Sequence, residues 1–189
     1  NVDSIHNAIT ENKKIMFQYF QWNLKKEMEL RHNGEMYHIS PWGLSWNDEN
    51  YYLVGYDSDD QMIKHYRVDK MLKIRMSDEP REGKKYFEKF DIGTYSRKNF
   101  SMFGGKEERV RLLMDNQMAG VVIDRFGKDV SMVPVDDNHF SINVDVVVSQ
   151  QFFGWVFALG KGVKIIGPES VVQQVNQEIK RLVEQYNME

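Results

Sequence analysis

A short stretch in the first half of the chain alternates cations with aromatic side chains. It runs from residue 38 to residue 75. Its last twelve residues hold five cations and one anion: Lys64, Arg67, Lys70, Lys73 and Arg75, against Asp69. Cations beside aromatic faces can stack on bases and pair with phosphates. The pattern therefore indicates either a pocket for a nucleotide or single-stranded nucleic acid, or a solvated edge strand whose aromatic residues lie in the core.

Known catalytic and metal-binding signatures are absent from the sequence. There is no G-x-G-x-x-G, G-x-x-x-x-G-K-[ST], G-x-S-x-G or H-E-x-x-H pattern. The chain has no cysteine, and the spacing of its five histidines reproduces no zinc site. The Asp-Asp pairs at 59–60 and 136–137 are typical of hairpin turns. We therefore expect no catalytic residue, no metal and no cofactor, and an enzyme is the least favoured class of protein.

Charge is balanced in both halves of the chain. Residues 1–76 carry 10 Lys and Arg against 11 Asp and Glu, and residues 106–189 carry 9 against 12. Tight binding of duplex DNA requires a dense footprint of cations, so we do not expect this chain to bind duplex DNA by itself.

No apolar run reaches the roughly 18 residues of a membrane span, and no signal segment is visible, so we expect a cytoplasmic protein without a membrane partner. Because the first residue is Asn1 and not Met, we expect that an upstream segment has been removed.

Short strands are predicted to position the cationic stretch. After an amphipathic helix at residues 3–13, the segments rich in aromatic and branched residues are 15–20, 24–31, 35–39, 51–56 and 62–68. Asn33-Gly34 marks a tight turn, because both residues tolerate a positive φ. This series of strands predicts a small barrel or a strongly curled sheet. Residues 77–105 show no sustained period and are predicted to be a linker, whose aromatic residues should pack on one domain or on a partner subunit.

The second half of the chain has a different order of elements. Its predicted segments are strand 110–114, helix 116–126, strand 130–135, strand 140–148, helix 150–159, strand 163–166 and helix 168–186. Ser149 is the expected N-cap of the second helix. This β-α-β-β-α-β order, followed by a helix, predicts a ferredoxin-like domain. The apolar stripe of the last helix is expected to pack on its own sheet. The whole chain is therefore predicted to be α+β.

The cationic stretch resembles the WYL domain family, whose pattern runs approximately Pro-Tyr-x-Leu, Trp-Tyr-Leu-x-x-x-Asp and Ile-Arg-x-Phe-Arg-x-Asp-Arg-Ile. The corresponding segments are Pro41-Trp42-Gly43-Leu44, Tyr51-Tyr52-Leu53 and Lys64-x-Tyr66-Arg67-x-Asp69-Lys70-Met71. Residues 124–127, 153–155 and 162–168 resemble the C-terminal WCX-type extension that often follows WYL domains in bacterial regulators. The resemblance divides the chain into a WYL domain at 1–76, a linker at 77–105 and an extension at 106–189.

The resemblance implies the sensor half of a bacterial transcriptional regulator. Its WYL part would be an Sm-like, SH3-like barrel that binds a nucleotide or nucleic-acid fragment and signals to an N-terminal helix-turn-helix domain missing here. The extension would form a homodimer. Transferred residue by residue, the ligand-binding candidates are Trp42, Tyr51, Lys64, His65, Arg67 and Lys70. Lys64 and Lys70 stand where the pattern has Arg, and Lys lacks the planar fork that grips phosphate. A direct single-stranded RNA or DNA binder without allostery is the alternative.

Strand geometry limits which of these residues can share a pocket. Successive side chains of a strand point to opposite faces, so His65 and Arg67 share one face. We favour this face for the ligand, because it leaves Met62, Tyr66 and Val68 as a mostly apolar inward row.

Overall fold

The computed structural model describes residues 1–47, 49–88, 92–100 and 105–187. The chain forms two compact units, residues 1–96 and 97–189. The division falls inside the predicted linker, and residues 89–91 and 101–104 of that linker lie outside the described residues. Each unit is described by itself below.

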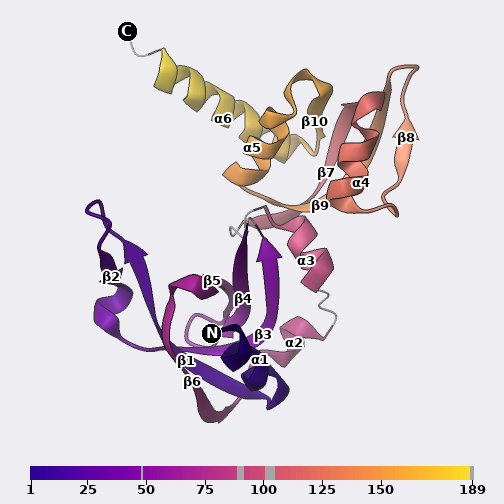
Figure 1. Ribbon diagram of the computed structural model, residues 1–189. Coiled ribbons are helices and arrows are strands. Elements are labelled where there is room, and N and C mark those ends of the chain that lie inside the picture. Colours follow the sequence, from indigo (N-terminus) through magenta and orange to yellow (C-terminus); the bar gives the residue numbers. More distant parts are fainter. Residues whose placement is uncertain (48, 89–91, 101–104, 188–189) are drawn as a thin grey trace. The chain divides into compact units, whose positions relative to one another are not determined.

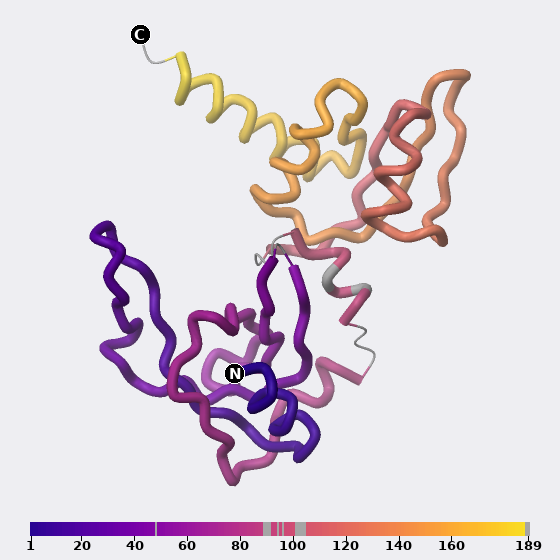
Figure 2. The backbone as a smooth tube through the Cα atoms, in the orientation of Figure 1, coloured from indigo at the N-terminus to yellow at the C-terminus, as the bar shows by residue number. Residues whose placement is uncertain are grey.

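The first unit is an antiparallel sheet that curls around an apolar core (Figure 1). Its elements are α1 (Val2–Thr10), β1 (Lys13–Trp22), β2 (Met28–Leu30), η1 (Arg31–Gly34), β3 (Tyr37–Asn47), β4 (Asn50–Asp57), β5 (Met62–Arg67), η2 (Val68–Lys70), β6 (Met71–Pro80) and α2 (Lys84–Phe87). The strand order is β2-β1-β3-β4-β5, and β6 pairs with β1. Figure 2 shows β6 running beside β1, although the two are far apart in sequence. The predicted curled sheet is therefore confirmed, whereas its Sm-like class remains a prediction.

One side of this sheet encloses the main core of the unit. Ile5 and Ala8 of α1 are fully buried against Phe17 of β1 and Met71 of β6. The alternation of buried and exposed residues on β1 puts Ile15, Phe17 and Tyr19 on this side. The helix at the start of the chain thus caps the sheet with its apolar stripe.

Two strands of this unit differ from the sequence-based expectation. The predicted segment 24–31 is a turn followed by the three-residue β2, because the Asn23 side chain accepts hydrogen bonds from the backbone N–H groups of Lys25 (2.9 Å) and Glu27 (3.0 Å). β3 continues through Pro41 and Gly43 with a register shift, where the sequence had suggested a break. The residues of the Asn33-Gly34 turn do adopt positive φ, at 52° and 82°.

The hairpin of β1 and β2 projects from the rest of the unit (Figure 1). Its register pairs Phe20 with Leu30 and Trp22 with Met28, so these apolar side chains share one face of the ribbon. Trp22 is 57% exposed and Met28 is 50% exposed, and Leu24 at the tip is fully exposed. Phe20 at the base of this face is only 5% exposed, so the exposed apolar surface lies towards the tip of the ribbon.

The second unit is a four-stranded antiparallel sheet with helices. Its elements are β7 (Lys106–Asp115), η3 (Asn116–Met118), α4 (Ala119–Phe126), β8 (Met132–Pro134), β9 (His139–Val148), α5 (Gln150–Ala158), η4 (Gly160–Gly162), β10 (Val163–Gly167) and α6 (Glu169–Tyr186). The strand order is β10-β7-β9-β8. The predicted N-cap is present, since Ser149 accepts a hydrogen bond from the backbone N–H of Phe152 (3.2 Å). A mixed α+β chain is thus confirmed, and the ferredoxin-like class of this unit remains a prediction.

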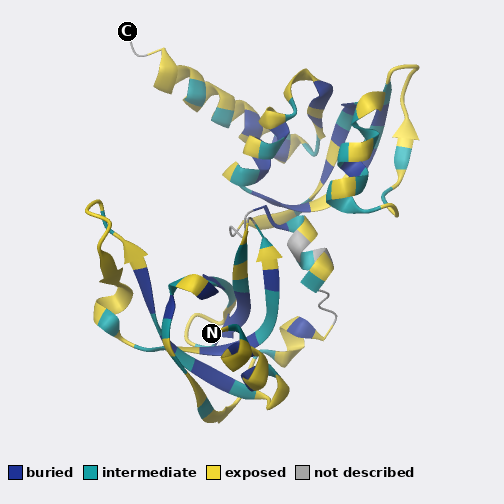
Figure 3. Ribbon diagram, in the orientation of Figure 1, coloured by how far each residue is buried: buried dark blue, intermediate teal, exposed yellow. Residues whose placement is uncertain are grey.

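The last helix packs on its own sheet over only part of its length. Val171 and Val175 are buried in the core of the unit. Further along the same helix Ile179 is 45% exposed, Val183 is 50% exposed and Tyr186 is 80% exposed. Figure 3 shows the exposed residues gathered on the free end of α6. The expectation that the whole stripe packs on its own sheet is therefore wrong for the second half of the helix, because α6 extends past the edge of the sheet.

Candidate ligand-binding site

β5 separates the predicted site residues onto the two faces of its sheet. Its register with β4 pairs Leu53 with Tyr66 and Val54 with His65. Tyr66 and Val68 are buried in the main core with Leu53. His65 and Arg67 are therefore on the opposite face, which we call the outer face. The sequence predicts Met62 in the apolar inward row, but Met62 is 52% exposed, because it is the first residue of β5.

Arg67 presents its guanidinium on the outer face, held by two neighbours. Its Nε and Nη2 atoms donate to the two carboxylate oxygens of Asp69, at 3.0 and 2.9 Å, and Nη2 also donates to Asn50 Oδ1 at 2.7 Å. The hydrogen bonds with Asp69 raise the pKa of Arg67 and lower the pKa of Asp69. The planar fork is thus preorganised for a bidentate anion, and a carboxylate of the chain itself occupies it.

Lys64 lies on the other face, in an acidic surrounding. Its Nζ contacts Asp57 Oδ2 at 2.8 Å and also forms an ion pair with Asp60. Burial is the largest single influence and opposes the charge of both Asp57 and Lys64. Their mutual hydrogen bond, the hydrogen bonds with Asp60 and the attraction of opposite charges together outweigh it, so the pKa of Asp57 is lowered and that of Lys64 is raised. A cavity of about 240 Å³ beside this pair is lined by four carboxylates, including Glu35 and Asp59. The structure therefore surrounds Lys64 with negative charge and separates it from Arg67.

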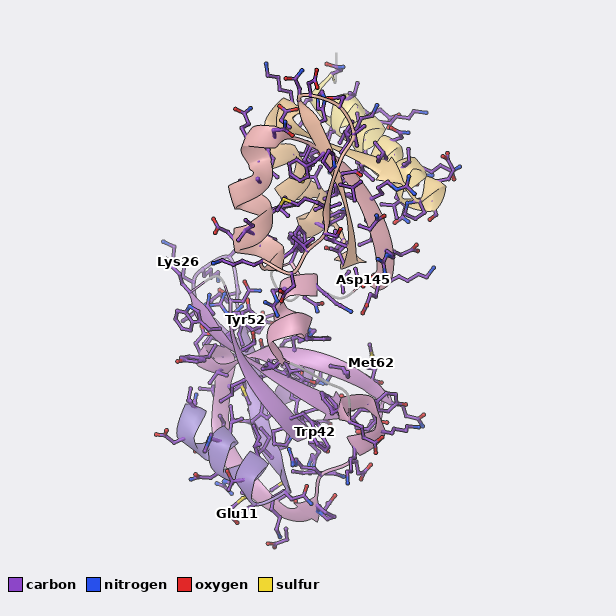
Figure 4. All side chains as sticks on the ribbon, turned by 90° about the vertical axis from the view of Figure 1, so that its right-hand side faces the viewer. Glu11, Lys26, Trp42, Tyr52, Met62 and Asp145 are labelled. Atoms are coloured by element: carbon purple, nitrogen blue, oxygen red, sulfur yellow. The ribbon has the colours of Figure 1, made fainter. Side chains whose placement is uncertain are left out.

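Trp42 contacts both an aromatic ring and a cation through its own ring. The Phe87 ring lies parallel to it, with centroids 4.8 Å apart and an interplanar angle of 9°. The Arg81 guanidinium lies over the Trp42 ring, 4.1 Å from its centroid. The indole N–H donates to the backbone carbonyl of Glu82 at 2.8 Å. Figure 4 shows Trp42 on the same unit as Tyr52, the residue that pairs with Arg67 across β4 and β5.

The other candidates lie in separate surroundings. His65 Nε2 forms a hydrogen bond with the Tyr95 hydroxyl at 2.9 Å, at helix α3 (Ile92–Lys98). Tyr51 packs edge-to-face against Trp46, with centroids 4.8 Å apart, where β3 and β4 meet, and its side chain alternates away from the outer face. Lys70 ends η2, directly after Asp69. The outer face thus brings together Trp42, His65 and Arg67, and it does not include Tyr51 or Lys64.

Sequence reasoning missed the partners of these side chains. Asp69 stands two residues after Arg67, a spacing that could have indicated the ion pair. Asp57 follows the Tyr-Tyr-Leu strand and could have been paired with Lys64 through the hairpin register. Phe87 and Tyr95 belong to the predicted linker, whose aromatic residues were expected to pack on a domain or on a partner subunit. Their individual partners, Trp42 and His65, follow only from the tertiary fold.

Among the described residues no group of three or more His, Asp or Glu side chains could hold a metal ion. Within the same ranges no helix is long and apolar enough to cross a bilayer. Neither finding indicates which ligand the candidate site binds.

Two family models match the chain. The WYL domain model matches residues 1–76, and the WCX domain model matches residues 106–183. No curated protein gives a significant match.

Two solved structures are similar to the chain. One, described as proteasome accessory factor B/C (PafBC) of Arthrobacter aurescens, is 20% identical, with a TM-score of 0.39 over 98% of this chain and 27% of that one. The other, described as a CRISPR Cas-related protein, is 12% identical, with a TM-score of 0.49 over 97% of this chain and 51% of that one. The chain thus spans about a quarter and about half the length of these proteins. By its two matched domains, the chain belongs to the WYL domain family, with a WCX domain as its second half.

Proposed function

We propose that the chain is the effector-sensing and dimerisation module of a bacterial transcriptional regulator. The observation that carries the proposal is the Arg67 fork, which a WYL domain presents on the outer face of its sheet together with Trp42 and His65. A guanidinium beside aromatic and imidazole rings suits a ligand that combines a phosphate with a base. A nucleotide or a nucleic-acid-like ligand is therefore the effector that fits best.

The proposed binding residues have unequal roles. Arg67 and Lys70 would pair with the anionic part of the ligand, while Trp42 and His65 would contact its ring. Asp69 competes with the ligand for Arg67, because it already occupies the fork at 2.9 and 3.0 Å. Lys64 and Tyr51 stay in the proposal only as secondary contacts away from the outer face, since the first is paired with Asp57 and the second with Trp46.

The signal would pass to an N-terminal DNA-binding domain outside this sequence. Charge supports this division of labour, because residues 1–76 and 106–189 each carry slightly more acidic than basic residues, whereas duplex DNA requires a cationic footprint. A regulator with a DNA target would work in the cytoplasm. The ligand must bind one arrangement of the regulator more tightly than another, since a ligand with equal affinity for both shifts nothing.

Homodimerisation through residues 106–189 is part of the proposal. The exposed stripe of Ile179, Val183 and Tyr186 on α6 supports it, because an apolar stripe at helical spacing is stabilised when a partner covers it. Light scattering on the intact chain tests this, and a monomer would contradict it.

We also propose finer fold classes, an Sm-like barrel for the first unit and a ferredoxin-like domain for the second. The curled sheet supports the first, and the strand order β10-β7-β9-β8 supports the second.

The experiment is fluorescence-anisotropy titration with labelled single-stranded DNA and RNA oligonucleotides at low and high salt. Wild type should bind, with affinity that falls as salt rises, and Arg67→Ala should lose most of the binding. The melting temperature should change little in this variant, because a solvent-accessible ion pair contributes roughly 0–1 kcal/mol. If wild type and Arg67→Ala bind equally, the proposed site is wrong.

The second candidate function is direct binding of single-stranded RNA or DNA without allostery. The exposed aromatic pair favours it, since Trp46 is 60% exposed and Tyr51 is 46% exposed, and exposed rings are stacking platforms for bases. Small-angle scattering with and without oligonucleotide discriminates the two functions. A ligand-dependent change in the scattering of the dimer supports the sensor, whereas binding without such a change supports the direct binder.

A further inference from the structure

The predicted linker does not leave the outer face open. We call residues 81–88 and 92–95 the strap. Its first residues are tied to the sheet: the Arg81 N–H donates to Asn12 O at 3.1 Å, and the Glu82 N–H donates to Ser40 Oγ at 2.9 Å. Glu82 also accepts from the buried Lys14 Nζ at 2.7 Å. These bonds fix the start of the strap on the first unit.

The strap then covers the two rings proposed to contact the ligand. Phe87, only 9% exposed, lies flat on Trp42 at 4.8 Å. Tyr95 packs beside His65 and shares a 2.9 Å hydrogen bond with it. Both strap residues belong to the small apolar cluster of the outer face, together with Val54.

The geometry of these contacts is that of a bound aromatic ligand. Trp42 has a flat ring stacked on it and the Arg81 guanidinium 4.1 Å from its centroid, and aromatic rings and guanidinium groups are the partners on which proteins stack a base. His65 has a hydroxyl within hydrogen-bonding distance, in the place of a polar group on a ligand. No other described ring lies parallel on Trp42 at stacking distance, so Phe87 alone takes that position.

We propose that the strap is an internal pseudo-ligand of the WYL domain, in which Phe87 and Tyr95 occupy the positions of a planar aromatic ring and its hydrogen-bonding group. The true ligand is then a molecule with a nucleobase-like ring, and it binds by displacing the strap. This inference rests on the proposed function, since it assigns the ligand class and the regulation of that same outer face.

Displacement of the strap would act on a helix that both units share. The division between the units falls within α3, after residue 96. Beyond it, Lys98 pairs with Glu107 at 2.5 Å, and Arg125 donates to the Asn99 carbonyl at 3.0 Å. A ligand that takes the place of Tyr95 therefore releases the first turn of a helix whose last turn stays tied to the second unit.

The first test compares Phe87→Ala with Tyr86→Ala in the intact chain, with a fluorescein-labelled oligothymidylate as the probe. Phe87→Ala removes the competitor from Trp42, so the dissociation constant should fall roughly 2- to 10-fold, the range for one aromatic pair. Tyr86 is the matched control, because it lies on the same helix but stacks on Tyr56. It should leave the affinity unchanged.

The second test fastens the strap with a disulfide. A Cβ added at Gly43 would lie 2.9 Å from Ile92 Cδ1 and 3.6 Å from Ile92 Cγ1, so the side chain of residue 92 reaches position 43, and a Gly43→Cys/Ile92→Cys pair joins the strap to β3. The natural chain has no cysteine, so this pair would be its only disulfide. Oxidised protein should bind the oligothymidylate at least about 10-fold more weakly than the same protein after reduction, since one aromatic pair already accounts for such a factor.

The outcomes separate this inference from the proposed function. If wild type binds through Arg67 but neither Phe87→Ala nor the disulfide changes the affinity, the pseudo-ligand inference fails and the proposed function stands. If no form of the protein binds, including reduced Gly43→Cys/Ile92→Cys and Phe87→Ala, the proposed function fails and the inference fails with it. Tighter binding by Phe87→Ala and redox-dependent binding by the cysteine pair support the inference.

Discussion

Replacing Lys64 by Met should destabilise the first unit at neutral pH. The substitution keeps most of the apolar side chain but leaves Asp57, whose side chain is 11% exposed, without its main cation. Removing one partner of a fully buried ion pair costs about 3–5 kcal/mol. The Lys64 side chain is 28% exposed, so water screens part of the interaction, and we expect a loss of about 2 kcal/mol. For a unit of 96 residues this lowers the melting temperature by about 10 °C.

The pH dependence of this loss identifies its cause. In wild type the pKa of Asp57 is lowered, so its contribution to stability is present above the unfolded pKa of about 3.9 and disappears as the pH falls through the folded value. In Lys64→Met burial acts without Lys64 to oppose it, so the pKa of Asp57 rises and the carboxyl becomes neutral sooner. The stability difference between wild type and variant should therefore be largest near neutral pH and shrink as the pH falls towards 4.

Urea denaturation of both proteins over this pH range measures the effect. The control is Lys13→Met, because Lys13 contacts the fully exposed Asp78 at 3.9 Å and should change stability by under about 1 kcal/mol. Asp57→Asn keeps the side-chain oxygen that accepts the turn N–H groups of residues 59 and 60. A double-mutant cycle of Lys64→Met and Asp57→Asn therefore isolates the interaction energy of the charge pair. A loss of the same size at pH 4 and at pH 7 would refute the reasoning, since it would show lost packing instead of an unpaired charge.

Three further predictions follow from single contacts. Asp69→Asn should free the Arg67 fork and tighten oligonucleotide binding several-fold in an anisotropy titration, with little change in melting temperature; weaker binding would mean that Asp69 positions Arg67 for the ligand. Val183→Lys puts a charge on the exposed stripe of α6 and should shift the dimer to monomer in light scattering, while circular dichroism stays the same. Ser149→Ala should cost about 1 kcal/mol in denaturant unfolding, because the Phe152 N–H loses its cap, and a change below the error of the measurement would contradict the capping role.

Periodicity predicted the elements whose residues alternate strictly. The strand around Val110 buries every second side chain, at positions 110, 112 and 114, and the sequence shows this alternation directly. Periodicity did not predict β6. Cations and carboxylates are frequent in residues 72–79, although this segment pairs with β1 as a strand. Periodicity also ended β3 too early, because Pro41 and Gly43 suggested a break where the strand only shifts register.

The candidate site was predictable residue by residue but not as an arrangement. The family pattern selected Arg67 and Lys64 equally, since both are cations of one strand. Their separation follows from the strand period, and their different environments follow from carboxylates contributed by other turns, Asp69 beside one and Asp57 beside the other. Contacts such as Phe87 on Trp42 join residues 45 positions apart, and no local pattern encodes them.

The projecting hairpin of β1 and β2 has a practical consequence for handling this protein. Trp22, Met28 and the fully exposed Leu24 are apolar side chains beside the free edge of a short strand, and an exposed apolar edge is a template for self-association. We therefore expect concentrated solutions to self-associate through the hairpin, in addition to any dimer formed through α6. Exchanging Leu24 for Lys would improve solubility, and it would make the mass measured by light scattering report on α6 alone.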